Sequence, residues 1–484
     1  MSLFIKKSLD QLMSQAGDSK NELKRTLGAG NLIALGVGAI IGAGLFVRTA
    51  WAASEAAGPA VTVSFIVAAI GCAFAGLCYA EFASIIPIAG SAYTYAYATL
   101  GEFLAWIIGW ALILEYALAA ATVSIAWSEY LNHLIGFSIP FQWCHSPFEV
   151  SELGVSGIMN VPALAILAIL TLLLIKGTQE SAVVNAIIVA VKVTIVLVFI
   201  IIGWQFIDPA NHTPFLIPEG TPGHEAFRKH GVGGILGGAA IVFFAFIGFD
   251  AVSTAAQEAK NPKRDMPIGI LGSLIFCTFL YVLFSYVLTG VAPWQDFATA
   301  GKEASVAYAI STYMPGYGWL SNLISVAILA GFSSVILVML MGQSRVFYTM
   351  SNDGLVPKVF SDIHPKYRTP YKSNVILFIF VGAFASFMPG TVAGDLTSFG
   401  TLFAFVLVCA GIWVMRVKQP DIVRPFTTPF VPLVPILGML VCSSLIASLD
   451  PNTLMFAFAW LLLGLLIYFA YGKKNSFLRN PRKN

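Results

Sequence analysis

The chain has 484 residues, of which 58% are hydrophobic and only 11% are charged. Soluble domains carry about 25% charged residues, so this composition and a mean hydropathy of +0.82 exclude a soluble globular protein. The formal net charge of +3 says little by itself, and we expect no nucleic-acid partner. The composition therefore predicts a polytopic membrane protein.

Twelve apolar stretches are long enough to cross the roughly 30 Å hydrocarbon core of a bilayer. No large soluble domain fits between them, so we expect an all-α membrane protein with 12 transmembrane helices. In chain order the predicted spans are about 31–54, 59–84, 101–134, 159–176, 182–206, 233–258, 267–291, 319–350, 372–390, 396–416, 430–449 and 453–471.

Basic residues are distributed unevenly between the connections. If the N-terminus is cytoplasmic, the cytoplasmic segments hold 22 Lys and Arg residues and the outside loops hold three. This asymmetry predicts that both termini face the cytoplasm of a cell-membrane protein. Residues 1–30 would be a cytoplasmic segment, either an amphipathic helix on the inner membrane surface or a disordered tail.

The first span is unusually rich in glycine, with Gly36, Gly38, Gly42 and Gly44 inside one apolar segment. Each glycine costs ~1 kcal/mol against alanine in a helix interior. Either the glycines form a close-packing face, or the helix breaks between Ile41 and Gly44. A break at membrane depth is tolerated only where protein or a polar cavity covers the backbone, which would make this stretch a candidate ligand cradle.

Residues 85–100 follow the second span and are too polar and aromatic to cross the membrane. We expect a cytoplasmic interfacial turn that carries Tyr93, Tyr95 and Tyr97.

Three ionisable residues fall at mid-span: Glu115 in helix three, Lys192 in helix five and Asp250 in helix six. Buried ionisable residues are costly in lipid and are functional candidates by default. The two carboxylates and the amine could form a buried hydrogen-bonded set, serving either as a structural ion pair or as a proton or ion relay.

Helix six repeats the glycine pattern of helix one, with several glycines between 231 and 238 and another at Gly248. A second interrupted span five helices after the first is expected of an inverted-repeat transporter. Residues 31–206 and 207–416 would be the two five-helix repeats, residues 417–471 would form helices eleven and twelve, and residues 472–484 would be a cytoplasmic tail.

The two interruptions together suggest the chemistry of a ligand. The N–H groups of Gly42, Ala43 and Gly44 would begin a half-helix whose positive dipole end suits a carboxylate. The C=O groups of Phe246, Ile247 and Gly248 would end another half-helix and suit an ammonium group. A site that binds an anion and a cation a few ångströms apart describes an α-amino acid, although glycine packing between helices remains the alternative. Phe244 is the best candidate for an aromatic gate over the ligand.

The chain resembles the amino acid–polyamine–organocation superfamily, and within it a bacterial twelve-helix form of the cationic amino acid transporter branch. The resemblance rests on IIGAGLFV in helix one, FFAFIGFDAVSTAAQEAKNPKRDMPIGI in helix six, Lys192, and QSRVFYTMSNDGLVP after helix eight. It implies the leucine-transporter-type 5+5 inverted repeat and alternating access. It also implies that residues 42–44 hold the substrate carboxylate, that carbonyls at 246–248 hold the amino group, and that Phe244 occludes the site.

Lys192 matches the family lysine that stands where sodium-driven relatives bind a cation. The resemblance implies that its ammonium group bridges carbonyls of helix one and hydroxyls of helix eight, where Ser333 and Ser334 are the candidates, and that the coupling ion is the proton.

The chain departs from its relatives at two positions, and a third side chain bears on the substrate. Ala43 stands where many relatives have Ser or Thr, and Arg48 stands where relatives are often uncharged. Arg48 could steer carboxylates inward or pair with Glu55. Phe332 looks bulky enough to shorten the side-chain pocket, which favours small neutral amino acids such as alanine.

Two other readings stay open. The first is an amino acid exchanger or facilitator for cationic amino acids with the same fold, and the second is a membrane nutrient receptor. No His or Cys is placed for an enzyme site or a metal site, so we expect neither an enzyme nor a cofactor. A small single-span partner helix is compatible with the sequence.

Overall fold

The computed structural model describes residues 5–7, 27–86, 91–151, 153–176, 182–299, 305–367 and 369–480, without the side chains of 182–185, 257 and 258. Within these ranges the regular structure is helical, apart from two isolated β-bridges. Most of residues 1–30 before the first helix, including the proposed amphipathic face, lies outside the described residues.

Each of the twelve predicted spans coincides with helical chain. The elements that correspond to uninterrupted spans are α4 (Val61–Ile85), α6 (Glu102–Leu134), α7 (Val161–Lys176), α8 (Ala182–Gly203), α10 (Pro262–Val291), α12 (Gly318–Asn352), α13 (Tyr371–Phe387), α14 (Gly390–Lys418), α15 (Leu433–Ala447) and α16 (Pro451–Ile467). Two short helices, α11 (Ser305–Tyr313) and α17 (Lys473–Asn475), were not predicted.

Eight helical segments within the described residues are long and apolar enough to cross a membrane. The shorter apolar helices are Ala29–Ile40, Val161–Lys176, Tyr371–Phe387 and Leu433–Ala447. The structure thus has several membrane-spanning helices, whereas the count of twelve crossings and the inverted repeat remain predictions.

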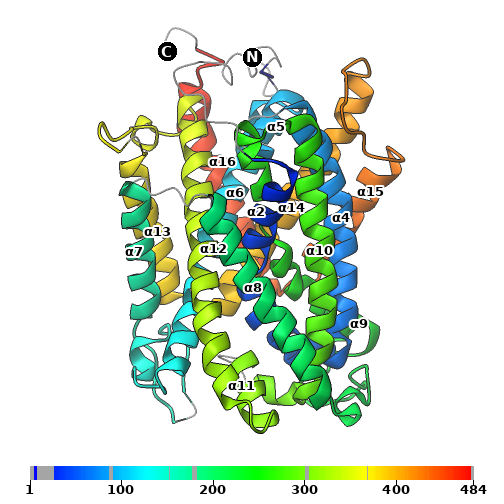
Figure 1. Cartoon of the computed structure of the whole chain (residues 1–484). Coiled ribbons are helices and arrows are strands. Elements are labelled where there is room, and N and C mark those ends of the chain that lie inside the picture. Colours follow the sequence, from blue (N-terminus) through cyan, green and yellow to red (C-terminus); the bar gives the residue numbers. More distant parts are fainter. Residues whose placement is uncertain are drawn as a thin grey trace.

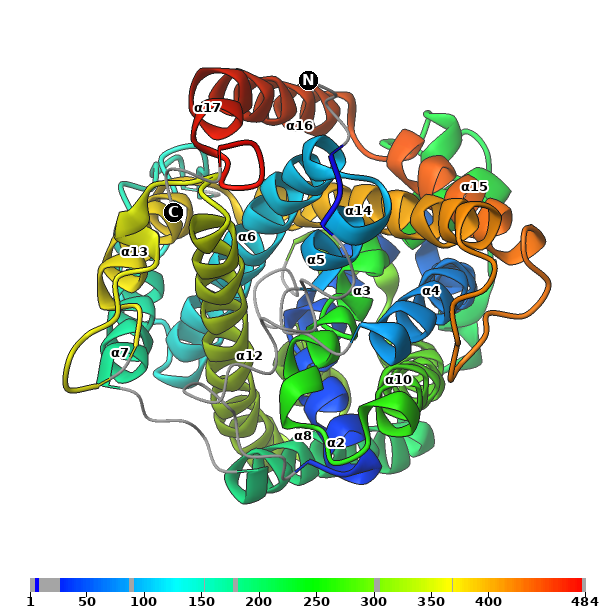
Figure 2. The ribbon, with the colours of Figure 1, turned by 90° about the horizontal axis from the view of Figure 1, so that it is seen from above.

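The helices form one elongated bundle (Figure 1). Viewed along its axis, α16 lies at the rim, α7 and α13 pair at another edge, and α2 lies between α8, α10 and α12 (Figure 2). The long helix α12 packs along α6, and α10 packs along α4. This arrangement surrounds the glycine-rich segments with long helices.

The predicted break in helix one is confirmed. The first half, α2 (Ala29–Ile40), ends where Ile41 turns to an extended conformation with φ −72° and ψ 104°. The chain resumes as a π-helical turn over Gly44–Arg48 and continues through α3 (Thr49–Ala52). Gly42, directly after Ile41, lowers the cost of leaving the helix there.

The predicted break in helix six is also confirmed. After α9 (Gly231–Val242) the chain tightens to a 3₁₀ turn over Phe243–Phe246, and Ile247 is extended. Gly248 has φ +115°, a value that residues with a side chain rarely adopt. A second 3₁₀ segment then runs from Asp250 to Glu258.

The predicted turn at residues 85–100 is a helix over most of its described part, and its position at the cytoplasmic interface remains a prediction. Residues Ser91–Thr99 form α5, whose side chains are all buried. The hydroxyl of Tyr93 donates to Asp353 at 2.6 Å, and that of Tyr97 donates to Glu102 at 2.9 Å. Because carboxylates accept hydrogen bonds from these two hydroxyls, an aromatic and polar segment can be buried here.

Candidate functional site

The two helix breaks lie against each other at the centre of the bundle. A Cβ atom on Gly44 would come within 2.2 Å of the Cα atom of Ala245, and a Cβ atom on Gly248 would come within 2.9 Å of the carbonyl oxygen of Ala39. Each glycine therefore allows the backbone of one interrupted helix to touch that of the other.

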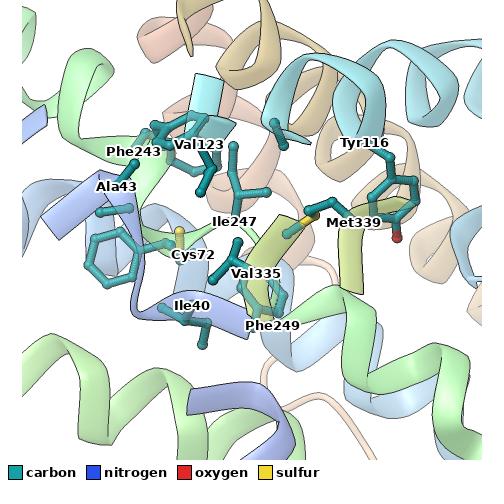
Figure 3. Packing of buried hydrophobic residues seen from close by; sticks show 14 of the residues in the cluster. Ile40, Ala43, Cys72, Tyr116, Val123, Phe243, Ile247, Phe249, Val335 and Met339 are labelled. Atoms are coloured by element: carbon teal, nitrogen blue, oxygen red, sulfur yellow. The ribbon is translucent and has the colours of Figure 1, made fainter. Parts of the chain in front are cut away.

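A small cavity of about 10 Å³ lies where the breaks meet, which is about the space one water molecule occupies. The side chains of Ala43, Val123, Ile247 and Val335 gather around it (Figure 3). Its lining is made of apolar residues: Ala39, Ile40, Gly42, Ala43, Gly44, Ala119, Val123, Phe244, Ile247, Val335 and Met339.

The structure brings several of the predicted substrate residues to this lining, namely Gly42, Ala43, Gly44, Phe244 and Ile247. Ile41, Phe246 and Gly248 belong to the breaks but not to the lining. Phe332 lies elsewhere, with its ring centroid 6.1 Å from that of Phe46 and 5.7 Å from that of Tyr130.

The lining also includes residues that sequence reasoning missed, on α6 and α12. Phe332, Val335 and Met339 recur at helical spacing, but only Val335 and Met339 line the cavity, so the contact lies further along α12 than the predicted Phe332. Glu115, Ala119 and Val123 share such a spacing on α6. This helical spacing was the sequence signal that could have identified the lining residues of α6 and α12.

The backbone at the first break offers hydrogen-bond donors to the cavity. The carbonyl oxygen of Gly42 accepts the N–H groups of Leu45 at 3.1 Å and Phe46 at 3.3 Å, which are the first bonds of the second half-helix. The N–H groups of Gly42, Ala43 and Gly44 precede those bonds and have no earlier helical turn to donate to. A half-helix that starts at an apolar cavity in this way favours a negatively charged group.

Side chains from neighbouring helices satisfy the carbonyl groups at the end of α2. Lys192 Nζ donates to the Gly38 oxygen at 2.8 Å, and the Tyr281 hydroxyl donates to the Ile40 oxygen at 2.9 Å. The predicted contact between Lys192 and helix one is thus present. The Ser333 hydroxyl donates to Leu329 in its own helix at 2.9 Å, and the buried Ser334 hydroxyl has no hydrogen-bond partner among the described residues.

The two buried carboxylates differ in their surroundings. Asp250 accepts a hydrogen bond from the Tyr116 hydroxyl at 2.9 Å. Neither oxygen of Glu115 has a hydrogen-bond partner within the described part of the chain, so the predicted hydrogen-bonded set with Lys192 does not form there. An ionised carboxylate without partners is very costly to bury, and Glu115, unlike Asp250, has no described group that would stabilise such a charge.

Arg48 is buried in the second half of helix one and forms an ion pair with Asp395 of α14. It also donates to the Thr391 oxygen at 3.3 Å. The predicted alternative of pairing with Glu55 is wrong, because Glu55 pairs with Lys229 at 3.1 Å. The π-helical turn that contains Arg48 directs its side chain toward α14, which the spacing within an ordinary helix does not reveal.

Two interrupted helices that meet at an apolar cavity inside a bundle of long apolar helices define a multi-pass membrane transporter, not an enzyme. Comparison with known proteins supports this class and specifies it. The model of the amino acid permease family matches residues 27–469, and the chain belongs to this family of the amino acid–polyamine–organocation superfamily.

Two relatives from Bacillus subtilis match along nearly the whole chain. The branched-chain amino acid permease BcaP is 44% identical over 98% of each chain. The methylthioribose transporter is 39% identical over 99% of each chain. The vacuolar cationic amino acid transporter 4 of Arabidopsis thaliana is 34% identical over 87% of this chain and 68% of its own length.

Proposed function

We propose that this protein takes up neutral aliphatic L-amino acids, from alanine to the branched-chain ones, coupled to protons and by alternating access. In this proposal residues 31–206 and 207–416 are inverted five-helix repeats, and both termini face the cytoplasm. The proposal rests on one observation above all: the two helix breaks touch each other beside one apolar cavity, which Gly42, Ala43, Gly44 and Ile247 help to line.

The chemistry of the cavity supports the substrate class. The N–H groups of residues 42–44 suit the substrate carboxylate, and the carbonyl groups of residues 246–248 suit its ammonium group. The remaining lining carries only apolar side chains, so a charged substrate side chain would be desolvated there without a partner. The name of the BcaP relative, a branched-chain amino acid permease, agrees with an aliphatic substrate.

Proton coupling is assigned to Lys192, Glu115 and Asp250, with Ser333 and Ser334 of α12 as further polar groups. Protonated Lys192 would hold the end of α2 through the Gly38 oxygen. Loss of that proton removes one donor and most of the attraction between the amine and the carbonyl group, which frees α2 to move. Phe244, in the cavity lining, would close over the bound amino acid.

Uptake by the purified protein in proteoliposomes tests the proposal. An inward proton gradient should drive accumulation of labelled alanine and leucine, with arginine transported at a far lower rate. Methylthioribose is included as a competitor, since one relative is named for it. Lys192→Ala should abolish accumulation driven by the gradient, and unimpaired gradient-driven accumulation by this variant would refute the role of Lys192.

The same vesicles separate the alternative functions. Counterflow of a cationic amino acid without any proton gradient would favour the exchanger or facilitator. Tight binding without any transport would favour a receptor.

A further inference from the structure

The segment that follows α16 folds back onto the bundle, where one buried carboxylate fixes it. Glu102, at the start of α6, is fully buried and accepts hydrogen bonds from Ser476 and Arg479 of this segment. The Tyr97 hydroxyl of α5 donates to the same carboxylate at 2.9 Å. Residues 472–480, which we call the clasp, are therefore held at a defined place against α6.

Backbone contacts fix the clasp at a second point, directly after α12. The N–H group of Phe477 donates to the carbonyl oxygen of Asp353 at 3.1 Å. A Cβ atom on Gly354 would come within 2.3 Å of the carbonyl oxygen of Asn475, so the two backbones touch. With contacts to both α6 and the end of α12, the clasp has a fixed conformation in which its basic side chains are positioned.

The clasp belongs to a strongly basic stretch of the chain. Residues 472–484 contain no acidic residue and five basic ones, which are Lys473, Lys474, Arg479, Arg482 and Lys483. The last two lie outside the described residues. Arg479 is buried in an ion pair with Glu102, whereas Lys474 is exposed and Lys473 is half-buried. The outer side of the clasp therefore carries positive charge.

The clasp also directly follows a lipid-facing part of the structure. The segment Pro451–Asn475 is apolar enough to cross a membrane, and α16 and α17 lie at the rim of the bundle (Figure 2). Phe469 and Tyr471 are exposed near the end of this segment, and Nζ of Lys473 lies 5.6 Å from the ring centroid of Phe469. Exposed aromatic rings beside lysines are typical of the level at which a helix meets lipid headgroups.

We propose that the clasp is a binding site for the headgroups of anionic phospholipids. Lys473 and Lys474 contact the phosphate group, and the pair of Arg479 with Glu102 positions the segment that carries them. Basic residues next to a transmembrane helix attract anionic lipids, and lysine binds phosphate as a point charge. Because the clasp is already ordered, lipid binding costs less conformational entropy than binding by a flexible tail. The site lies outside the transport cavity and does not depend on the proposed substrate.

Native mass spectrometry of the purified full chain, titrated with phosphatidylglycerol or with phosphatidylcholine, tests the proposal. The unaltered protein should bind phosphatidylglycerol more tightly than the neutral lipid. The double variant Lys473→Gln, Lys474→Gln should bind phosphatidylglycerol about thirtyfold more weakly, which corresponds to about 2 kcal/mol for two lysines. Lys372→Gln is the matched control, because it removes an exposed lysine that pairs with Asp362 on α13 and the chain before it. This variant should keep the original affinity.

Glu102→Gln distinguishes a fixed clasp from a flexible basic tail. This substitution leaves every positive charge of the clasp in place and removes the carboxylate that holds Arg479. We expect weaker binding of phosphatidylglycerol and faster cleavage by trypsin after Lys474. If charge alone attracted the lipid, loss of a negative group would leave binding unchanged or make it tighter, and that result would overturn the role of the clasp.

Three further outcomes would contradict the lipid site itself. They are equal affinities for the two lipids, an unchanged affinity in the double lysine variant, and an equally large loss in Lys372→Gln. None of these measurements uses an amino acid or a proton gradient. Their results therefore stand even if the proposed transport function fails in the uptake assay.

Discussion

The guanidinium carbon of Arg48 lies 5.9 Å from the ring centroid of Phe244, and the same guanidinium group pairs with Asp395. A cation at this distance from an aromatic face is attracted to it. The proposed gate residue is thus connected to α14 through a part-buried ion pair. A movement of Arg48 or Asp395 would therefore change the cation–π contact of the Phe244 ring.

Breaking this ion pair should be costly. Asp395→Asn leaves the buried Arg48 charge without its counter-charge; loss of one partner of a fully buried pair costs roughly 3–5 kcal/mol, and because Asp395 is 18% exposed the cost here should lie at or below the lower end of that range. We expect a clear drop in the thermal unfolding temperature and loss of amino acid uptake.

Lys229→Gln serves as the control for that variant. It removes the more exposed pair with Glu55 on the same interrupted helix, and such a pair contributes about 0–1 kcal/mol. Equal losses of stability in the two variants would contradict a special role for the Arg48–Asp395 pair.

Glu115→Gln should change the free energy of unfolding very little. Both oxygens of Glu115 lack partners among the described residues, so an amide of the same size breaks no described hydrogen bond and should cost about 1 kcal/mol or less. If Glu115 carries a proton during transport, the variant should also lose the pH dependence of uptake. Unfolding by denaturant in detergent and uptake across a pH series measure the two effects.

Glu81→Gln is the comparison variant, because the side chain of Glu81 is as fully buried as that of Glu115. The Glu81 carboxylate accepts two hydrogen bonds from Arg416, at 2.9 and 3.0 Å, so Glu81→Gln should cost roughly 3 kcal/mol. A stability loss of that size in Glu115→Gln would show that Glu115 is ionised and paired.

We expect that the protein does not tolerate alanine in place of Gly44 or Gly248, where the two helix breaks touch. Gly44→Ala places a methyl group within 2.2 Å of the Ala245 backbone, and Gly248→Ala adds strain at φ +115°. Each substitution should cost more than about 2 kcal/mol and abolish uptake.

The matched glycine is Gly30 in α2, where an added Cβ atom meets nothing within 4 Å. Gly30→Ala should raise stability by up to about 1 kcal/mol through helix propensity. Wild-type uptake by Gly44→Ala would be incompatible with direct contact between the two interrupted helices.

Acid should destabilise the connection after α8. Burial lowers the pKa of His212 from its usual 6.5, where its ring packs 4.5 Å from Tyr286 and contacts Thr289 at 3.3 Å. The folded state thus binds this proton less readily than the unfolded state. The stability contributed by neutral His212 is present above pH 6.5 and is lost as the pH falls toward the lowered pKa.

The corresponding test compares unfolding temperatures at pH 7.5 and pH 5. His212→Gln, which cannot be protonated, should lose less stability on acidification than the unaltered protein. His212→Lys carries the charge throughout and should be less stable than His212→Gln at both pH values. An identical acid response of the His212→Gln variant would exclude His212 as the titrating group.

The sequence predicted those parts of the site that depend on the free-energy cost of keeping particular residues in a helix. Four glycines in one apolar span and a glycine at position 248 indicate where helices can break, because a helix interior disfavours glycine. Lys192 was identified because a mid-span amine needs an acceptor, and the end of α2 provides it.

The missed contacts depend on three-dimensional packing. Arg48 and Asp395 are 347 residues apart, and Tyr281 reaches Ile40 across 241 residues. A tyrosine in an apolar helix carries no periodic signal that distinguishes a hydrogen-bonded hydroxyl from a packing ring. The burial of α5 was missed for the same reason, since Tyr93 donates to Asp353, which is 260 residues away in the sequence.

The donors that hold the end of α2 have a consequence for biosynthesis. Lys192 follows its acceptor by 154 residues and Tyr281 by 241 residues. When the ribosome has completed only the first two helices, neither donor has been made, and the broken end of α2 must bond to water, lipid headgroups or the insertion machinery. The binding geometry is therefore acquired late, after α10 joins the nascent bundle, and a nascent chain arrested before that helix would lack a formed cradle.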